Sequence, residues 1–195
     1  MIHLKDLGTF ESVPDLVTDI INGNITALES ALKNGLDIHK LIQIGKYSEY
    51  SPLQLALVMD CLPSVKWLVE HGADLNDKEN PSFLLAVRYG NQEIIDYVVA
   101  HGANIHALNC VNVDAFQAAL YGKRYENLQL IHDLGHTVQK YGGRAFRNAI
   151  TDKNYEVLDF FINNGVDINY NKPDSVYPFK PTPLCVACLL YTSPS

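Results

Sequence analysis

Cysteine and histidine are the residue types in this chain that could hold a metal ion or carry redox chemistry. Cys185 and Cys188 form a C-x-x-C motif, a spacing used by zinc sites and thiol oxidoreductases. A tetrahedral zinc site needs two further ligands, and no second pair lies near this one in the sequence. We therefore expect both cysteines to be small buried residues of a helix. With Cys61 and Cys110 the chain has four cysteines, which are sparse for a disulfide scaffold, so reduced thiols are expected.

Four of the seven histidines recur at two kinds of position. His71 and His101 each precede a glycine at a predicted helix end, where an imidazole complements the negative end of the helix dipole. A second position, four residues after a glycine, holds a polar residue in each case: His39, Asn76, His106, Gln139 and Asn169. We predict structural roles for both positions and no metal site.

Signatures of catalysis and of phosphate binding are absent from the sequence. There is no glycine-rich loop ending in Gly-Lys-Ser/Thr and no G-x-S-x-G motif. Carboxylates are numerous, but no pair stands out as an acid–base couple. We therefore expect a protein that is not an enzyme and that uses no cofactor.

The charge balance narrows the class of partner. The formal net charge is -7 and charged residues make up 19% of the chain, which argues against nucleic acid and against an anionic membrane. The first residues contain no continuous apolar stretch of the kind found in a signal peptide. We expect a cytoplasmic protein, in the host cytoplasm if it is a viral or bacterial effector.

A fixed spacing recurs along the chain and predicts the elements that would position a site. An apolar residue is followed three places later by alanine five times: Leu53/Ala56, Phe83/Ala86, Phe116/Ala119, Phe146/Ala149 and Leu184/Ala187. In four of these copies a glycine lies sixteen residues after the alanine: Gly72, Gly102, Gly135 and Gly165. Gly35 extends the frame backwards to a degenerate first copy. All variation in length falls between each glycine and the next copy, so rigid units alternate with loops.

Each unit is predicted to form two short helices that end at its glycine, which accepts the left-handed backbone conformation. The predicted helix pairs are residues 14–34, 52–71, 82–101, 115–134 and 145–164. The second helices carry apolar residues seven and four places before the glycine, which gives one buried stripe. Leu68, Val98 and Phe161 are predicted to be fully buried. Ser51-Pro52 and Thr182-Pro183 are predicted helix starts, with a capping hydroxyl followed by proline.

These segments resemble the ankyrin repeat family. "SPLQLA" and "TPLCVA" are similar to its Thr-Pro-Leu-His-x-Ala signature, and "VKWLVEHGADLN" to its second helix and following turn. The alanines recur at 30, 33, 30 and 38 residues, close to the family's period of about 33. The resemblance implies an all-α solenoid of stacked helix-turn-helix repeats with short hairpin-like loops. The shortened connections resemble those of ankyrin proteins of giant amoebal viruses.

The resemblance also suggests how the chain is divided. Residues 1–12 are predicted to be a lead-in, and residues 13–190 an array of about five repeats plus the start of a sixth. The last copy stops at "CLLYTSPS" before a second helix, so residues 191–195 are expected to be a truncated tail.

Ankyrin-like arrays bind partners on a concave face, and one row of positions suits that role. The residues two and three places after the repeated alanine vary while the frame stays fixed. Those we assign to the partner-binding face are Met59, Arg88, Tyr89, Tyr121 and Asp152. Aromatic, methionine and arginine side chains are enriched at interface centres. A second interpretation stays open, in which the two tyrosines pack on the adjacent loop.

The two long connections, residues 36–51 and 166–182, are rich in aromatic residues. Tyr47 and Tyr177 are candidate contacts, although such loops can also be pinned to the array. The leading hypothesis is a monomeric, non-catalytic module that binds another protein, one that is neutral or basic because this chain is acidic. The alternative is the ankyrin targeting arm of a larger enzyme or of a ubiquitin-ligase adaptor.

Overall fold

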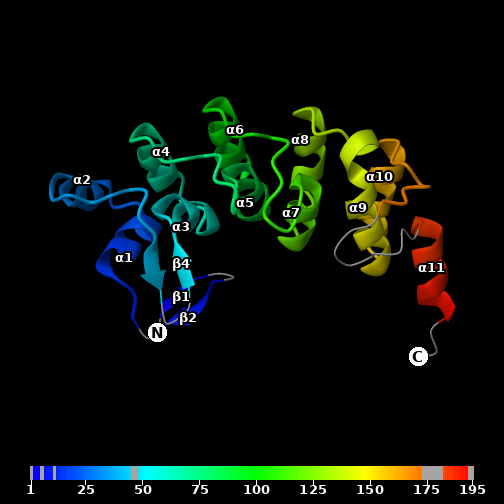
Figure 1. The fold of residues 1–195 in the computed structure, drawn as a ribbon, viewed down its shortest axis with the longest axis horizontal. Helices are drawn as coiled ribbons and strands as arrows, with labels where there is room; N and C mark the ends of the chain where they lie inside the picture. Colours follow the sequence, from blue (N-terminus) through cyan, green and yellow to red (C-terminus); the bar gives the residue numbers. More distant parts are fainter. Residues whose placement is uncertain (1, 5–6, 11, 45–47, 173–181, 193–195) are drawn as a thin grey trace.

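The fold is a row of stacked helix pairs (Figure 1). The computed structural model describes residues 2–4, 7–10, 12–44, 48–172 and 182–192. The first helices of the pairs form one layer and the second helices form the other, and we call these the first-helix layer and the second-helix layer. The predicted all-α solenoid is confirmed.

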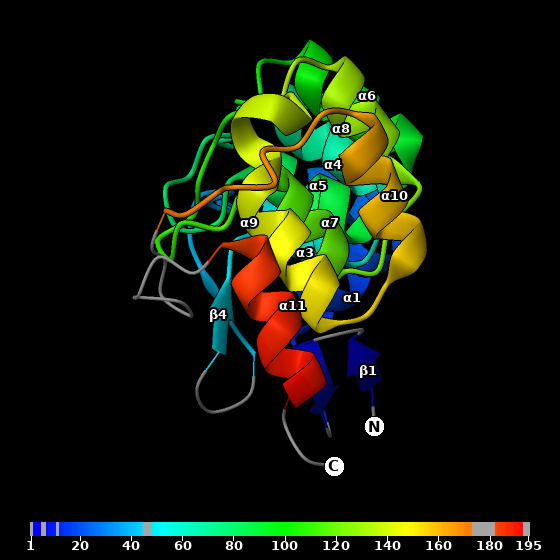
Figure 2. The same ribbon diagram turned by 90° about the vertical axis from the view of Figure 1, so that its right-hand side faces the viewer.

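The helices of the first-helix layer are α1 (Asp15–Asn22), α3 (Pro52–Val58), α5 (Ser82–Tyr89), α7 (Ala115–Tyr121), α9 (Val138–Thr151) and α11 (Pro183–Thr192). Those of the second-helix layer are α2 (Ile25–Lys33), α4 (Leu62–Glu70), α6 (Gln92–Ala100), α8 (Asn127–Asp133) and α10 (Tyr155–Asn163). Each first helix packs on the next one along the row, and α11 packs on α9 (Figure 2). Sequence neighbours are therefore spatial neighbours, as expected for a solenoid.

Two antiparallel hairpins lie at the N-terminal end of the row. One pairs β1 (Ile2–Leu4) with β2 (Gly8–Phe10). The other pairs β3 (Ile42–Ile44) with β4 (Ser48–Tyr50). The second hairpin is formed by the long connection 36–51, which the sequence analysis predicted as a loop.

The helix ends follow the predicted capping chemistry. Ser51 Oγ accepts a hydrogen bond from Gln54 N at 3.2 Å, and Gln54 Oε1 accepts one from Ser51 N at 3.0 Å, which makes a complete capping box. At the start of α11, Cys185 N donates to Thr182 Oγ1 at 3.3 Å. At the other end of a pair, Gly72 adopts φ +92°, which a side chain would disfavour. The predicted starts and stops are confirmed at these positions.

The buried stripe is also confirmed. Leu68, Val98 and Phe161 are fully buried, each with 0% of its surface exposed. These side chains belong to one cluster of buried apolar residues drawn from successive repeats, so the core is continuous along the row. Burial of such side chains supplies most of the stability of a short helix pair.

One helix boundary differs from the prediction. α9 begins at Val138, whereas the frame predicted a start near residue 145. Gly142 and Gly143 disfavour a helix intrinsically, but their small size permits close packing here. A Cβ on Gly142 would lie 3.1 Å from the Phe161 ring, and one on Gly143 would collide with the Tyr170 ring. Tertiary packing therefore overrides the local propensity.

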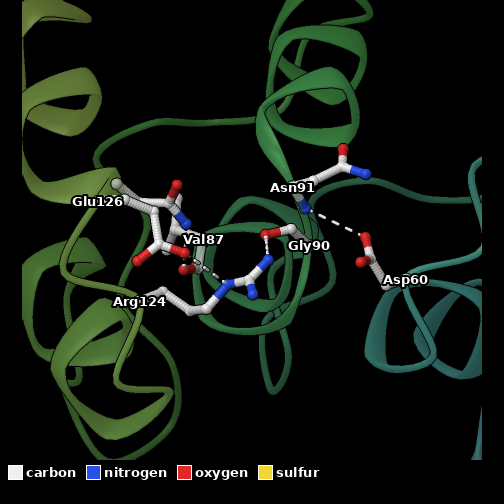
Figure 3. A network of polar contacts seen from close by, with 7 residues as sticks. Asp60, Val87, Gly90, Asn91, Arg124 and Glu126 are labelled. Carbon is white, nitrogen blue, oxygen red and sulfur yellow. Dashed lines mark hydrogen bonds and ion pairs between the residues drawn. The ribbon is translucent and has the colours of Figure 1, made fainter.

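Polar contacts join successive repeats where a first helix turns into a second. The carbonyls at the end of a helix lack partners within the helix, and here the next repeat supplies them. Two contacts of this kind are Arg124 Nη2 to Gly90 O at 2.6 Å and Asn127 Nδ2 to Val87 O at 2.9 Å (Figure 3). In a third contact, Asn91 N donates to the side-chain carboxylate of Asp60 in the preceding repeat, at 3.1 Å to Oδ1. Arg124 also forms an ion pair with Glu126 at 3.4 Å. These contacts fix the spacing between neighbouring helix pairs.

Candidate partner-binding face

A pocket lies between α5 and α7 in the first-helix layer. On α5 it is lined by Pro81, Leu84, Leu85 and Arg88, which recur every three or four residues and so share one face of the helix. On α7 it is lined by Ala118 and Tyr121, and across its end by Asn80, Asn109, Val111 and Val113. Its volume is about 220 Å³. The pocket is a groove between two parallel helices, closed at one end by the loop 109–113.

The structure brings two of the predicted partner-binding residues together in this pocket. Arg88, the penultimate residue of α5, is half-buried, and Tyr121, the last residue of α7, is 46% exposed. Tyr89 does not line the pocket, but its ring lies under the Arg88 guanidinium at 4.9 Å. This cation–π contact restricts the directions in which Arg88 can point.

The other predicted residues lie elsewhere. Met59 is the partly buried C-cap of α3 and packs against the core, and Asp152 is the exposed C-cap of α9. Neither lines the pocket between α5 and α7. Tyr47 and Tyr177 lie outside the described residues. The five positions in the repeat frame therefore do not form one uniform site.

The loop 109–113 is held in shape by its own hydrogen bonds. Asn109 Oδ1 accepts from Val111 N at 3.1 Å and from Val113 N at 2.9 Å. Asn112 adopts φ +61°, a left-handed conformation that asparagine tolerates. Arg144 of α9 donates from Nη1 to Asn112 O. The turn therefore presents Val111 with 58% of its surface exposed.

The start of α7 is a second anchor for this loop. Asp114 caps the helix through Gln117 N at 3.0 Å, and Arg144 Nη1 lies 3.4 Å from Gln117 Oε1. Burial raises the pKa of Asp114 to about 6, although the Gln117 hydrogen bond and the nearby Arg144 charge both act in the opposite direction. Arg144 therefore stabilises both the loop 109–113 and the charged form of Asp114, the residue that caps α7.

Sequence reasoning missed the loop residues of the pocket. Val111, which lines the pocket, is 58% exposed, and Leu108, in the same connection but outside the pocket lining, is 49% exposed, although large apolar side chains are usually buried. The signal was present, since "HALNCVNVDA" places several apolar residues in a connection that belongs to no helix. Exposed apolar residues that cluster in one loop are typical of an interaction site.

Acidic side chains gather on the other layer. The exposed carboxylates of the second-helix layer are Glu29, Glu70, Glu93, Asp96, Glu126, Asp133, Glu156 and Asp159. By contrast, among the residues that the structure describes, Arg88 is the only charged one that lines the pocket. The exposed negative charge is therefore concentrated on the second-helix layer, whereas the pocket carries a positive charge.

The histidines have the structural contacts that were predicted. His71 Nδ1 lies 2.7 Å from Trp67 O and His101 Nδ1 lies 2.8 Å from Tyr97 O, so each imidazole bonds a carbonyl at its helix end. The polar position four residues after the glycine reaches the next repeat. There Asn76 Nδ2 donates to Gly102 O at 3.1 Å. Among the described residues no cluster of three or more metal-ligating side chains occurs.

His106 takes part in a ring cluster between α7 and α9. Its Nδ1 lies 3.2 Å from Nδ1 of His136, which is fully buried, and the Tyr141 ring stacks on His136 at 4.0 Å between centroids. Burial lowers the pKa of His136 to about 4, and the neighbouring His106 charge acts in the same direction. His136 is therefore neutral near pH 7, and the ring cluster has a structural role, since it packs between α7 and α9.

The prediction that Cys185 and Cys188 are buried is wrong, since both are exposed on α11. The equivalent of Cys185 in an earlier repeat, Leu84, lies against the following first helix α7, and in the part of the chain that the structure describes no helix follows α11. Leu184 is 71% exposed for the same reason.

Within the described ranges no helix is long and apolar enough to cross a membrane.

Comparisons with known proteins agree with this architecture. A family model described as ankyrin repeats (3 copies) matches residues 8–109. The chain is similar to ankyrin repeat and SOCS box protein 14 of Mus musculus, with 33% identity over 98 residues, which is 48% of this chain and 17% of the mouse protein. It is also similar to putative ankyrin repeat protein R886 of Acanthamoeba polyphaga mimivirus, with 43% identity over 42 residues. That match covers 22% of this chain and 32% of the viral protein. The chain thus spans less than a third of the length of either relative.

Proposed function

This chain belongs to the ankyrin repeat family, and from that premise we propose that it is a non-catalytic module that binds a protein partner on its first-helix layer. Ankyrin repeats are protein–protein interaction modules. We place the binding site of this chain on a specific face and on specific residues. Arg88, Tyr89 and Tyr121 are its central residues, with Met59 and Asp152 at its edges.

The pocket between α5 and α7 is the observation that carries the proposal. It combines an apolar floor with a tyrosine and an arginine at its rim, and these are the residue types that dominate binding energy at interface centres. Val111 and Tyr121 leave exposed apolar surface in its lining. Burial of that surface by a partner is favourable.

Partner capture followed by mutagenesis tests the proposed face. The chain would be immobilised, exposed to amoebal and mammalian lysates, and the captured proteins identified by mass spectrometry and then purified. Tyr89→Ala and Tyr121→Ala should each weaken binding of the purified partner by about tenfold or more, with an unchanged thermal midpoint. Glu93→Ala, in the second-helix layer, is the matched control. Normal binding by both tyrosine variants together with loss of binding in the control would exclude the first-helix layer.

A second candidate function is the targeting arm of a ubiquitin-ligase adaptor. The observation that favours it is the similarity to a mouse protein whose name includes a SOCS box. On this proposal the repeat array, residues 13–190, selects the substrate and another segment of the protein recruits the ligase. A longer reading frame that encodes such a segment would support it.

We also propose that the array is monomeric and works in the cytoplasm. Sedimentation velocity at several concentrations tests the first point, since a monomer of 21.8 kDa should show no dependence on concentration. Fluorescence microscopy of the tagged chain in amoebal cells tests the second.

A further inference from the structure

We propose that the pocket between α5 and α7 receives one bulky apolar side chain of an extended partner segment, with a carboxylate next to it that pairs with Arg88. This inference rests on the proposed function, because it concerns the same face. It goes further by stating the chemistry of the segment that binds.

The size and lining of the pocket define the apolar half of the ligand. Leu84, Leu85, Pro81 and Ala118 supply aliphatic surface, and Val111 and Val113 supply the end wall. An apolar cavity of about 150 Å³ is sufficient for a benzene ring, and this pocket measures about 220 Å³. One leucine, methionine or phenylalanine side chain therefore fits, whereas a small side chain would leave part of the apolar surface in contact with water.

The charge of the pocket defines the other half of the ligand. Arg88 is the only charged side chain in its lining within the described part of the chain, and a guanidinium matches a carboxylate in planar, bidentate geometry. Its stacking on the Tyr89 ring at 4.9 Å reduces the conformational freedom that it would lose on binding. A lysine in the ligand at this position would be repelled.

The end wall of the pocket is already in place. Asn109 closes the turn through two backbone N–H groups, and Arg144 holds Asn112 from the next repeat. An ordered loop loses less conformational entropy when a ligand binds to it. Asn80, which also lines the pocket, provides a side-chain amide that suits the backbone of an extended peptide.

Small peptides of defined sequence test this chemistry by NMR. The probes are acetyl-Leu-Glu-amide, acetyl-Leu-Gln-amide and acetyl-Ala-Glu-amide, titrated to millimolar concentration into the ¹⁵N-labelled chain. The Leu-Glu peptide should shift the amide resonances of Leu85, Val111 and Tyr121. The Leu-Gln and Ala-Glu peptides should bind several-fold to tenfold more weakly, because each lacks one of the two contacts.

Single substitutions assign the two contacts. Arg88→Gln should abolish the difference between the Leu-Glu and Leu-Gln peptides, and Val111→Ser, at a position 58% exposed, should weaken both. Lys66→Gln in the second-helix layer is the control and should behave as the unmodified chain. Three results would overturn the inference. The Glu and Gln peptides could bind equally well, the shifts could be confined to other surfaces, or no resonance could shift at 10 mM peptide. The last result would mean a dissociation constant well above 10 mM, which corresponds to a binding free energy weaker than about 2.7 kcal/mol.

The captured partner separates this inference from the proposed function. If Tyr121→Ala loses the partner while Arg88→Gln and Val111→Ser retain it, the face is correct and the pocket chemistry is wrong. If Tyr89→Ala and Tyr121→Ala both bind the partner normally, the proposed function fails whatever the peptides do.

Discussion

The interval between α5 and α7 and the interval between α7 and α9 are built on the same repeat frame but are filled differently. In the first, residues 101–114 connect the second helix to the next first helix, and an open pocket remains. In the second, only residues 134–137 separate α8 from α9, and the extra turns of α9 carry Tyr141 and Arg144. Tyr141 stacks on the two histidines, and Arg144 reaches back to the loop 109–113.

The difference shows how one repeat can support a site on its neighbour. Where the connection stays a loop, apolar residues are left exposed and a ligand can be received. Where the connection becomes helix, its side chains fill the interval and anchor the loop of the preceding one. We therefore expect stability to depend most on the second interval and binding to depend most on the first.

The largest effect is expected from Phe161→Ala. Phe161 is fully buried and its ring lies 5.4 Å from that of Phe116 and 6.2 Å from that of Phe146, so it joins α7, α9 and α10. Its truncation should lower the free energy of unfolding by about 3–5 kcal/mol, measured by urea unfolding followed by circular dichroism. Tyr155→Ala, on the same helix but 67% exposed, should change it by less than about 0.5 kcal/mol. Equal midpoints for the two variants would show that the second interval is not the stabilising one.

Acid should lower the free energy of unfolding through His136, which lies in the second interval, between α7 and α9. Its pKa of about 4 in the folded state lies below the unfolded value of about 6.5, so the unfolded chain binds the proton more tightly. The stability that the neutral ring provides is present above about pH 6.5 and is lost as the pH falls toward 4, by at most about 1.4 kcal/mol per pH unit. Unfolding free energies measured between pH 7.5 and 5 check this.

Two variants separate the effect of His136 on the pH dependence of stability from that of Asp114, which has the opposite sign. The raised pKa of Asp114, about 6, means that the folded state binds its proton more tightly, so this group favours folding as the pH falls from about 6 to its unfolded value. Asp114→Asn should therefore steepen the loss of stability in acid, and His136→Gln should remove it. A pH dependence unchanged in His136→Gln would assign the effect to other groups.

A smaller loss is expected from Gly122→Ala in the first interval. A Cβ at this position would collide with the backbone carbonyl of Arg88, and backbone cannot yield as a flexible side chain does. Forcing α5 and α7 apart should cost about 1–3 kcal/mol and shift the amide resonances of the pocket residues. Tyr121→Ala, at the adjacent exposed position, should leave the unfolding midpoint within error. A stable Gly122→Ala variant with unshifted pocket resonances would mean that the two helices are not in close contact.

The smallest effect on stability, and the sharpest test of the link between the two intervals, is Arg144→Gln. Loss of its hydrogen bonds to Asn112 O and Gln117 Oε1 should cost about 1 kcal/mol. Hydrogen exchange at Val113 N–H should become faster, and the Leu-Glu peptide should bind more weakly although no pocket residue has changed. Lys140→Gln, whose amine lies over the Tyr141 ring at 4.9 Å, is the control. Unchanged exchange in the Arg144 variant would show that the loop holds its shape without α9.

Much of the fold could be predicted because its determinants are local in sequence. The sixteen-residue frame, the capping box at Ser51 and the buried residues Leu68 and Val98 all follow from helical periodicity and end chemistry. The start of α9 could not, because Gly142 and Gly143 disfavour helix locally and are accommodated only by contacts with Phe161 and Tyr170. The exposure of Cys185 was missed because burial depends on the helix that packs opposite.

The sequence by itself therefore determined the repeat, its helix pairs and the positions free to vary, since each depends on residues three to sixteen places apart. Only the tertiary structure decided which of those positions form a pocket. Arg88 and Tyr121, each two places after the repeated alanine, line the same groove, while Val58 and Thr151, at the equivalent places in other repeats, do not. The reason is that the groove ends at the loop 109–113, which Arg144 contacts from 32 residues beyond Asn112, and no local spacing encodes that contact.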